Sequence, residues 1–386
     1  MKSFNGNRLK TARQYRGLTV EELAQKINVS KQAVSQYETG RIEDVPFQRI
    51  FSISNVLNFP YQYFVQDDIP SLKTGATYFR SLMKTSKKYR LAQEIKMEHI
   101  AVIYSYLSEY VDFPNLNIPS LEEKAYTPTK AAKVLRDFWG LEDKPIENIM
   151  QTVEQNGIIV TTFSTETDDI DAFSQYVRLV DSDLFIIALS NNKESAARIN
   201  FDIAHELGHI MLHEWSENEE VLTREEFKQK EKEANEFAAA FLLPKETFTQ
   251  DVILDPQRLD YYVQLKRKWK VSIAAMLYRS CDLGLISQGQ YQYMIRVMQN
   301  KGWRKTEPLD KTMKATQPSL LADAVGLLLD NNVFTTKEFV DELENMGMAM
   351  NPDELEVLLN LQKGTLMQKN ESPTQIVSLK PLGDYK

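Results

Sequence analysis

The sequence is poor in cysteine, glycine and proline, and it lacks any long apolar segment. Cys281 is the only cysteine among 386 residues, so an intramolecular disulfide and a zinc cage of thiolates are both excluded. The 14 Gly and 14 Pro argue against collagen-like or low-complexity architecture. No run of 18 apolar residues occurs, and the start MKSFNGNRLK has no apolar signal-peptide core. We therefore expect neither secretion nor a membrane span, and we expect a cytoplasmic protein.

Length and charge divide the chain into parts. A single hydrophobic core stops growing at ~250–300 residues, so 386 residues predict several domains. Residues 1–66 carry nine Lys or Arg against five Asp or Glu, a charge of +4. Because the whole chain has a net charge of −8, the remaining residues carry −12. We predict a mainly helical α+β protein. It comprises a helical domain at 1–66, a helical linker at 67–125, a domain with a small sheet at 126–308 and a helical C-terminal region at 309–386.

Periodicity places the elements within these parts. Residues 73–112 are expected to be helical and begin with a basic stretch from Lys73 to Arg90, which is either a solvated helix face or a contact to DNA backbone. Three β-branched, apolar runs predict strands at 157–163, 172–180 and 184–190, the last two as a hairpin. Helical periodicity follows at 193–213, 224–243, 257–300 and 318–368.

The N-terminal part has the pattern of a helix-turn-helix. Two short helices, roughly 19–26 and 30–37, are predicted with Thr19 and Ser30 as N-caps and with Glu22 completing a capping box. The second helix of such a pair enters the major groove of double-stranded DNA. Side chains suited to base edges or phosphates lie on or next to its exposed face: Lys31, Gln32, Ser35, Gln36 and Arg41. We expect operator binding as a homodimer, because one such unit buries too little surface for tight binding.

Three of the four histidines cluster at 205, 209 and 213. His205-Glu206-Leu207-Gly208-His209 fits H-E-x-x-H, in which residues four apart differ by about 40° around a helix and both imidazoles can hold one Zn²⁺. Glu206, about 100° away, is expected to reach a metal-bound water as general base. His213 lies about 12 Å along the helix from His205, so we expect it beside the ligands or at the surface, and not on the metal.

The third ligand is expected from the helix 230–244. On a helical wheel Glu231 lies at the edge of the apolar face, Glu233 lies at the other edge as the fallback, and Glu236 points away. A carboxylate on a core-facing edge is costly unless it is paired or binds metal. Asn235, one turn after Glu231, is expected to orient a ligand. A His205, His209 and Glu231 set with an open position is typical of catalytic zinc.

These segments also resemble known families. LTVEELAQKINVSKQAVSQYETG resembles the XRE (Cro/CI-type) helix-turn-helix family, which implies an Arg13–Glu38 pair. RINFDIAHELGHIMLH followed by EKEANEFAAAFLLP resembles the ImmA/IrrE metallo-endopeptidases. This second resemblance implies a zincin-like peptidase domain, zinc as cofactor, Glu231 as third ligand and an XRE-type repressor or an antitoxin-type protein as substrate. It also implies a helix-turn-helix-like subdomain at about 257–300, which we expect to pack on the peptidase and not to contact DNA.

Taken together, the pattern predicts a DNA-binding regulator with zinc endopeptidase activity. Two alternatives remain: a non-enzymatic, zinc-containing transcription factor that senses a ligand or partner, and the toxin half of a toxin–antitoxin pair. In the peptidase interpretation, the strand region 171–177 is expected to pair with an extended substrate segment.

Overall fold

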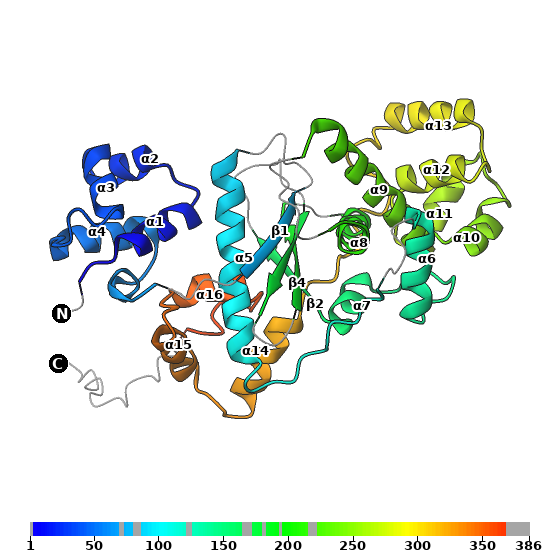
Figure 1. Ribbon diagram of the computed structural model, residues 1–386. Coiled ribbons are helices and arrows are strands. Elements are labelled where there is room, and N and C mark those ends of the chain that lie inside the picture. Colours follow the sequence, from blue (N-terminus) through cyan, green and yellow to red (C-terminus); the bar gives the residue numbers. More distant parts are fainter. Residues whose placement is uncertain are drawn as a thin grey trace, which may run out of the picture.

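The computed structural model describes residues 3–68, 73–79, 86–120, 126–163, 172–179, 183–192, 195–214 and 222–367. Parts of the predicted helical linker (69–72, 80–85 and 121–125) and the turn of the predicted hairpin at 181–182 lie outside these residues. In Figure 1 the long helix α5 (Lys87–Leu107) runs between the N-terminal helices and a small sheet, and the C-terminal helices α14 to α16 lie beside its lower half. No helix in the described ranges combines the length and the apolarity that crossing a membrane requires.

The N-terminal domain consists of α1 (Gly6–Tyr15), α2 (Val20–Lys26), α3 (Lys31–Glu38), α4 (Phe47–Leu57) and the 3₁₀ helix η1 (Tyr61–Val65). Thr19 and Glu22 form the expected capping box of α2, and Ser30 caps α3 by accepting a hydrogen bond from the amide of Ala33. The turn between α2 and α3 passes through Asn28 at φ 54°, a left-handed conformation that Asn tolerates better than most residues. The predicted helix-turn-helix is confirmed.

A four-stranded sheet of order β1-β3-β4-β2 forms the centre of the molecule. Its strands are β1 (Lys73–Phe79), β2 (Ile158–Phe163), β3 (Ala172–Arg178) and β4 (Asp183–Ser190). β3 and β4 form the predicted antiparallel hairpin, and β2 joins β4 in parallel. The prediction that residues 73–112 are helical is wrong at its start, because 73–79 pair antiparallel with β3. The interaction that overrides the local pattern is the long-range strand pairing.

The pairing of β1 also removes β3 from the sheet edge. β3 has β1 on one side and β4 on the other, so both of its rows of backbone hydrogen-bonding groups face neighbouring strands. The prediction that an extended substrate segment pairs with 171–177 is therefore wrong, because neighbouring strands already occupy both sides of β3. The described edges of the sheet are β1 and β2.

The strands alternate between two hydrophobic cores. Ile159 and Ile186 face one core together with apolar residues of α5, whereas Ile158 and Ile187 face the other together with apolar residues of α8 (Ala196–Leu212). Successive side chains of a strand point to opposite faces, so a strand that is apolar throughout is buried on both sides. The other helices within the described ranges are α6 (Pro128–Phe138), α7 (Ile149–Gln155), α9 (Arg224–Leu242), α10 (Lys245–Val252), α11 (Leu259–Trp269), α12 (Ile273–Asp282), α13 (Gln288–Asn300), α14 (Leu320–Asp330), α15 (Thr336–Asn345) and α16 (Pro352–Leu358).

The C-terminal helices pack against the N-terminal domain. Both belong to the core on the α5 side of the sheet. Glu354 of α16 accepts hydrogen bonds from the Tyr15 hydroxyl at 2.6 Å and from Arg16 at 2.7 Å. Lys88 at the start of α5 forms an ion pair with Glu22 at 2.8 Å. The N-terminal domain is thus connected to the rest of the molecule by side-chain contacts as well as by the linker.

Candidate metal centre and nucleic-acid surface

The two helices α8 and α9 meet at a glycine. A Cβ atom placed on Gly208 would lie 3.0 Å from the Cα of Ala234 and 3.2 Å from the Cβ of Phe237, closer than ordinary van der Waals contact. Glycine therefore allows the backbones of α8 and α9 to approach each other. This approach brings Glu231, one turn before Ala234, over the histidines of α8.

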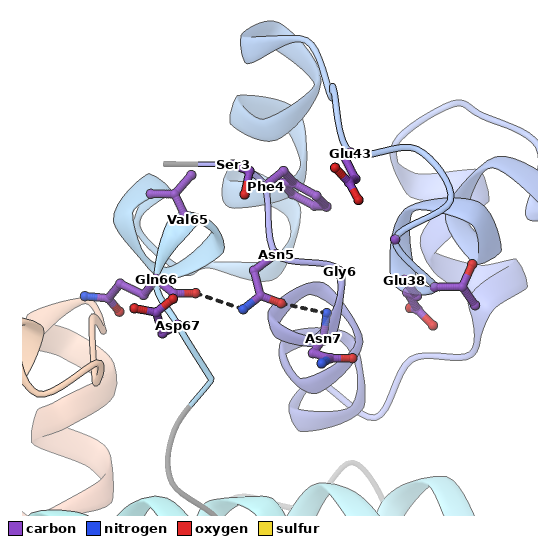
Figure 2. A pocket seen from close by; sticks show the side chains of 12 residues that line it. Ser3, Phe4, Asn5, Gly6, Asn7, Glu38, Glu43, Val65, Gln66 and Asp67 are labelled. Carbon is purple, nitrogen blue, oxygen red and sulfur yellow. Dashed lines mark hydrogen bonds between the residues drawn. The ribbon is translucent and has the colours of Figure 1, made fainter. Parts of the chain in front are cut away.

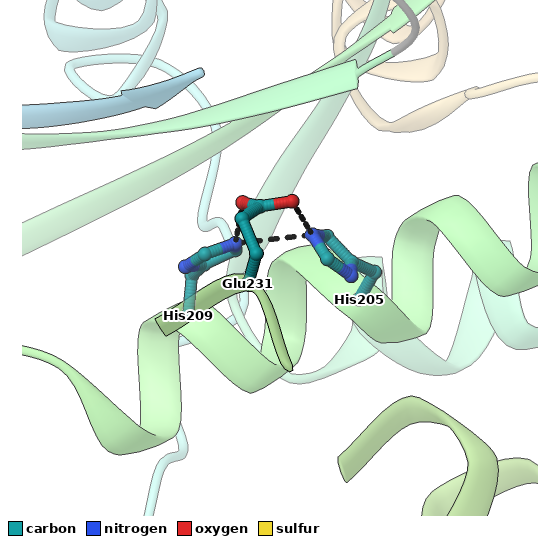
Figure 3. A group of neighbouring side chains, drawn as sticks. All are labelled: His205, His209 and Glu231. Carbon is teal, nitrogen blue, oxygen red and sulfur yellow. Dashed lines mark hydrogen bonds and ion pairs between the residues drawn. The ribbon is translucent and has the colours of Figure 1, made fainter. Parts of the chain in front are cut away.

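His205, His209 and Glu231 converge at one point, as Figure 3 shows. The Nε2 atoms of the two histidines are 3.1 Å apart. The carboxylate oxygens of Glu231 lie 3.2 Å from Nε2 of His209 and 3.7 Å from Nε2 of His205. Ligand atoms of a tetrahedral zinc ion, each about 2.0–2.1 Å from the metal, are separated by about 3.3 Å. The three donor atoms therefore have the spacing of a zinc site.

The protonation states of the group suit a cation. Burial lowers the pKa of His209 to about 4, so its imidazole is neutral at pH 7. Burial opposes ionisation of Glu231, but the interactions with the imidazoles of His205 and His209 outweigh it and lower the pKa of this carboxyl to about 2. A metal ligand must present a neutral imidazole or an ionised carboxylate, and His209 and Glu231 do so at neutral pH.

Asn235, which the sequence predicts to orient a ligand, lies beside His205. Its side-chain nitrogen donates to the backbone carbonyl of Glu231 at 2.7 Å, which leaves its Oδ1 as the acceptor 3.2 Å from Nδ1 of His205. The imidazole then carries its proton on Nδ1, so Nε2 presents its lone pair to the metal position. An outer hydrogen bond of this kind sets the tautomer of metal-binding histidines.

His213 and Glu233 form a chain of contacts that ends at His209. Oε2 of Glu233 lies 3.2 Å from Nε2 of His213, whose Nδ1 lies 3.0 Å from Nδ1 of His209. Because the Glu233 carboxylate accepts the Nε2 proton of His213, Nδ1 of His213 accepts the proton of His209. Glu233, the fallback ligand, contacts His213 and is not part of the convergent group.

Glu206 has a partner that the sequence analysis missed. Its Oε2 accepts a hydrogen bond of 2.6 Å from the hydroxyl of Ser174 on β3, and both side chains are inaccessible to solvent. Ser174 lies 32 residues before Glu206, in the strand that the hairpin pattern predicted. The alternation of that strand could have shown that Ser174 faces α8, but a buried serine by itself does not reveal its partner.

The expected DNA-reading residues lie together on the N-terminal domain. Lys31, Gln32, Ser35, Gln36 and Arg41 line one shallow hollow of about 530 Å³, along with Thr39. The pair implied by the family resemblance is present: Nε of Arg13 lies 2.5 Å from Glu38, and Nη1 of Arg13 donates to the carbonyl of Leu18 at 2.7 Å. This pair joins α1 to the end of α3 and holds the recognition helix in place.

A second hollow on this domain has a different character. Figure 2 shows Asn5, which accepts from the amide of Asn7 at 2.9 Å and donates to the carbonyl of Gln66 at 2.9 Å, so that it caps α1 and anchors the end of η1. The ionisable side chains that line the hollow, Glu38, Glu43 and Asp67, are all acidic. This lining does not fit DNA phosphates, and the basic hollow along α3 is the better nucleic-acid surface.

Comparison with known families supports both halves of the molecule. Residues 153–280 match the IrrE N-terminal-like domain, and residues 9–64 match a helix-turn-helix family. The chain joins a helix-turn-helix domain to an IrrE-like domain. A search of curated proteins found no match. The first match indicates a metallopeptidase-like domain of the ImmA/IrrE kind, and the second indicates DNA-binding regulation.

The IrrE-like domain includes the whole candidate metal group and ends within α12. The pair α11–α12 repeats the helix-turn-helix geometry, with Lys270 at φ 55° in the turn and Ser272 as N-cap of α12. However, the carboxylate of Glu307 accepts hydrogen bonds from the amides of Ile273 and Ala274, so the helix end that would face a phosphate is occupied. Ile273 itself is buried. These contacts favour the interpretation that this pair packs on the IrrE-like domain.

Proposed function

We propose that the protein is a zinc-dependent endopeptidase that also binds operator DNA, and that it controls genes by cleaving a protein partner. The observation that carries this proposal is the convergence of His205, His209 and Glu231 within the segment that matches the IrrE-like family. Two neutral imidazoles and one carboxylate form the donor set of catalytic zinc, which keeps one position open.

Each residue of the group has a separate task in this proposal. His205, His209 and Glu231 would hold the ion, and Asn235 and His213 would keep the two imidazoles in the tautomer that presents Nε2. A bound zinc ion supplies Lewis acidity, which polarises a peptide carbonyl and lowers the pKa of water. Glu206 would accept the proton of the attacking water and pass it to the leaving amine. The hydroxyl of Ser174 would hold the Glu206 carboxylate in one orientation.

The helix-turn-helix domain directs the activity to DNA in the same proposal. Gln32, Ser35 and Gln36 would contact base edges, and Lys31 and Arg41 would contact phosphates of a double-stranded operator. We propose a homodimer on two half-sites. The substrate class is a DNA-bound repressor of the XRE type or an antitoxin-type protein, and its cleavage would relieve repression of mobile-element or stress genes.

Metal analysis of ligand variants tests the site. The purified protein should hold about one zinc ion per chain. Each of the variants His205→Ala, His209→Ala and Glu231→Ala should lose this zinc ion or bind it much more weakly. Glu236→Ala is the matched control, because Glu236 is a carboxylate of the same helix that lies outside the convergent group and pairs with the exposed Lys232. If Glu233→Ala empties the site while Glu231→Ala keeps it filled, the assignment of the third ligand is wrong.

The attachment of the N-terminal domain favours a second candidate, a zinc-containing transcription factor without peptidase activity. Its α1 is tied to α16 through Arg16 and Glu354, and it shares a core with α5 and the sheet, so a change near the metal group has a route to DNA binding. A Glu206→Gln protein that retains zinc separates the two functions. The peptidase proposal expects this variant to lose regulation in cells, whereas the transcription-factor alternative expects regulation to be unchanged.

A further inference from the structure

The side of α8 that faces the metal position also carries a cation. Arg198 precedes His205 by seven residues in this helix, so the two side chains differ by about 20° around its axis and by about 10 Å along it. His209 is about 40° from His205 in the same sense, so the direction of Arg198 falls between those of the two histidines. Figure 3 shows both histidines pointing from α8 toward Glu231. Arg198 therefore lies on the metal-facing side of α8, nearer to the start of the helix.

This side of α8 lies between α9 and the sheet. Gly208 faces α9 and is about 60° from His205 in one direction around the helix. Glu206 faces β3 through Ser174 and is about 100° from His205 in the other direction. An extended peptide rises by about 3.3 Å per residue. When its scissile carbonyl lies at the metal position and its backbone follows α8 toward the start of the helix, a side chain about three residues away lies next to Arg198.

The Arg198 side chain is exposed and has no acidic partner among the residues that the structure describes. Its Nη2 donates to the carbonyl of Lys305 at 2.7 Å, and this acceptor is neutral. A guanidinium group has five N–H donors, so one such contact leaves donors for a carboxylate. Asp202, one turn later on α8, is 3% exposed and forms no ion pair with Arg198. The neighbouring helix α11 differs, because three of its lysines are paired with carboxylates: Lys266, Lys268 and Lys270.

The segment 304–310 is attached to the start of α8 at two points. Ser195, the N-cap residue of α8, donates from its hydroxyl to Oδ1 of Asp310 at 2.7 Å. The second point is the contact between Arg198 and the carbonyl of Lys305. The Arg198 guanidinium is thereby held in one place, so less side-chain entropy is lost when it binds a ligand.

The charges of this segment are sorted by direction. Its acidic residues, Glu307 and Asp310, are buried and accept hydrogen bonds from the buried ammonium group of Lys266, each at 2.7 Å. Its basic residues, Arg304 and Lys305, are exposed, and neither side chain has a carboxylate partner in the described part of the chain. Together with Arg198, they present three positive charges at the start of α8, while the carboxylates of the same segment face the interior.

We propose that Arg198, with Arg304 and Lys305 beside it, forms a subsite for an acidic side chain of the substrate, about three residues from the bond that is cleaved. The inference rests on the proposed peptidase function and narrows its substrate class to proteins whose cleaved segment carries Asp or Glu at that distance. A carboxylate accepts two parallel N–H bonds from a guanidinium group, and a basic side chain is repelled by it. Arg198 thus determines which segment is cleaved, and the zinc ligands and Glu206 carry the chemistry.

Peptide selection with an inactive variant tests the subsite without cleavage. The full-length Glu206→Gln protein, loaded with zinc, is immobilised and incubated with a proteome-derived peptide library, and the retained peptides are identified by mass spectrometry. We expect Asp and Glu to be enriched about threefold or more over the library. Arg198→Glu in the same background should remove this enrichment and favour Lys and Arg, because it reverses the charge of the residue that meets the peptide.

Cleavage of the same library by the zinc-loaded protein with intact Glu206 gives the position. We expect the acidic residue at one position, about two to four residues from the cleaved bond and on one side of it only. For a single cleaved peptide, Arg198→Gln should lower kcat/KM about tenfold, mainly through KM. Replacing the acidic residue of that peptide by Gln should cost the same factor, and the two changes together should cost no more than either alone.

Lys337→Glu is the control, because it reverses an exposed charge on α15, which lies away from α8 in Figure 1, and it should leave both profiles unchanged. Cleavage without an acidic preference, or with a preference that Arg198→Glu does not alter, overturns the subsite and leaves the peptidase function standing. An acidic preference in retention that depends on Arg198, without any cleavage, overturns the peptidase function and leaves the peptide subsite standing. Neither retention nor cleavage overturns both.

Discussion

Gly208 offers the most direct test of how packing sets the metal group. We consider Gly208→Ala, which adds a single methyl group inside the H-E-x-x-H sequence. That methyl group would lie 3.0 Å from the Cα of Ala234 and 3.1 Å from its carbonyl oxygen. Both neighbours are backbone atoms of α9, so no side chain can rotate away to relieve the contact.

The magnitude follows from that distance. Ordinary contacts to a Cβ atom lie at 3.4–4 Å, so α9 must move away from α8 by about half an ångström. Overpacking of this kind costs about 1–3 kcal/mol of unfolding free energy. The move also carries Glu231 away from His205 and His209, whereas zinc–ligand distances tolerate only about ±0.2 Å. We therefore expect zinc affinity to fall about tenfold or more.

The assay combines zinc competition against a chromophoric chelator with urea unfolding followed by circular dichroism. Gly326→Ala is the matched control, because Gly326 also lies within a helix, α14, and a Cβ there meets nothing within 4 Å. That control should keep its zinc affinity and gain up to about 1 kcal/mol from the higher helix propensity of Ala. If Gly208→Ala behaves like Gly326→Ala, the close approach of the two helices does not set the metal group.

Three further predictions concern other parts of the molecule. Glu38→Gln should cost about 3–5 kcal/mol in urea unfolding, because it leaves the Arg13 guanidinium buried without its charge partner, and a loss below about 1 kcal/mol would contradict this. Gln32→Ala should lose about 1–3 kcal/mol of discrimination at one base in operator titrations, whereas Lys31→Ala should weaken binding evenly and reduce the salt dependence; identical effects would refute the assigned roles. Burial, opposed by amide hydrogen bonds from Leu320 and Ser319, raises the pKa of Glu154 to about 7. The folded state then holds this proton more tightly than the unfolded chain, so the wild type should lose stability relative to Glu154→Gln as the pH rises from about 4.5 to 7, and a pH-independent difference would be inconsistent with the raised pKa.

Local patterns in the sequence were sufficient for much of the candidate site. The four-residue spacing of His205 and His209 places both on one helix face whatever surrounds the helix. Glu231 followed from its position at the edge of the apolar face of α9, and the structure brings it to both histidines. The N-caps Thr19 and Ser30 were equally readable, because a cap interacts only with residues two or three positions away.

Contacts between distant segments were not readable in the same way. Residues 73–79 have no strict alternation, and only pairing with β3 makes them a strand. That pairing also overturned the expectation that 171–177 form an open edge. Ser174 reaches Glu206 across 32 residues, and no pattern in either segment alone indicates this contact.

The sequence by itself determined which helices form and which of their faces are apolar, because helix periodicity and capping depend on neighbours within one or two turns. It thereby determined that His205 and His209 share one helix face and that residues 31–38 form the second helix of the helix-turn-helix. Only the tertiary structure decided that α1 is tied to α16 through Arg16 and Glu354, 338 positions apart, and that residues 304–310 lie against the start of α8. Such contacts depend on how preformed helices and strands bury their apolar faces together, and that arrangement is a property of the whole chain.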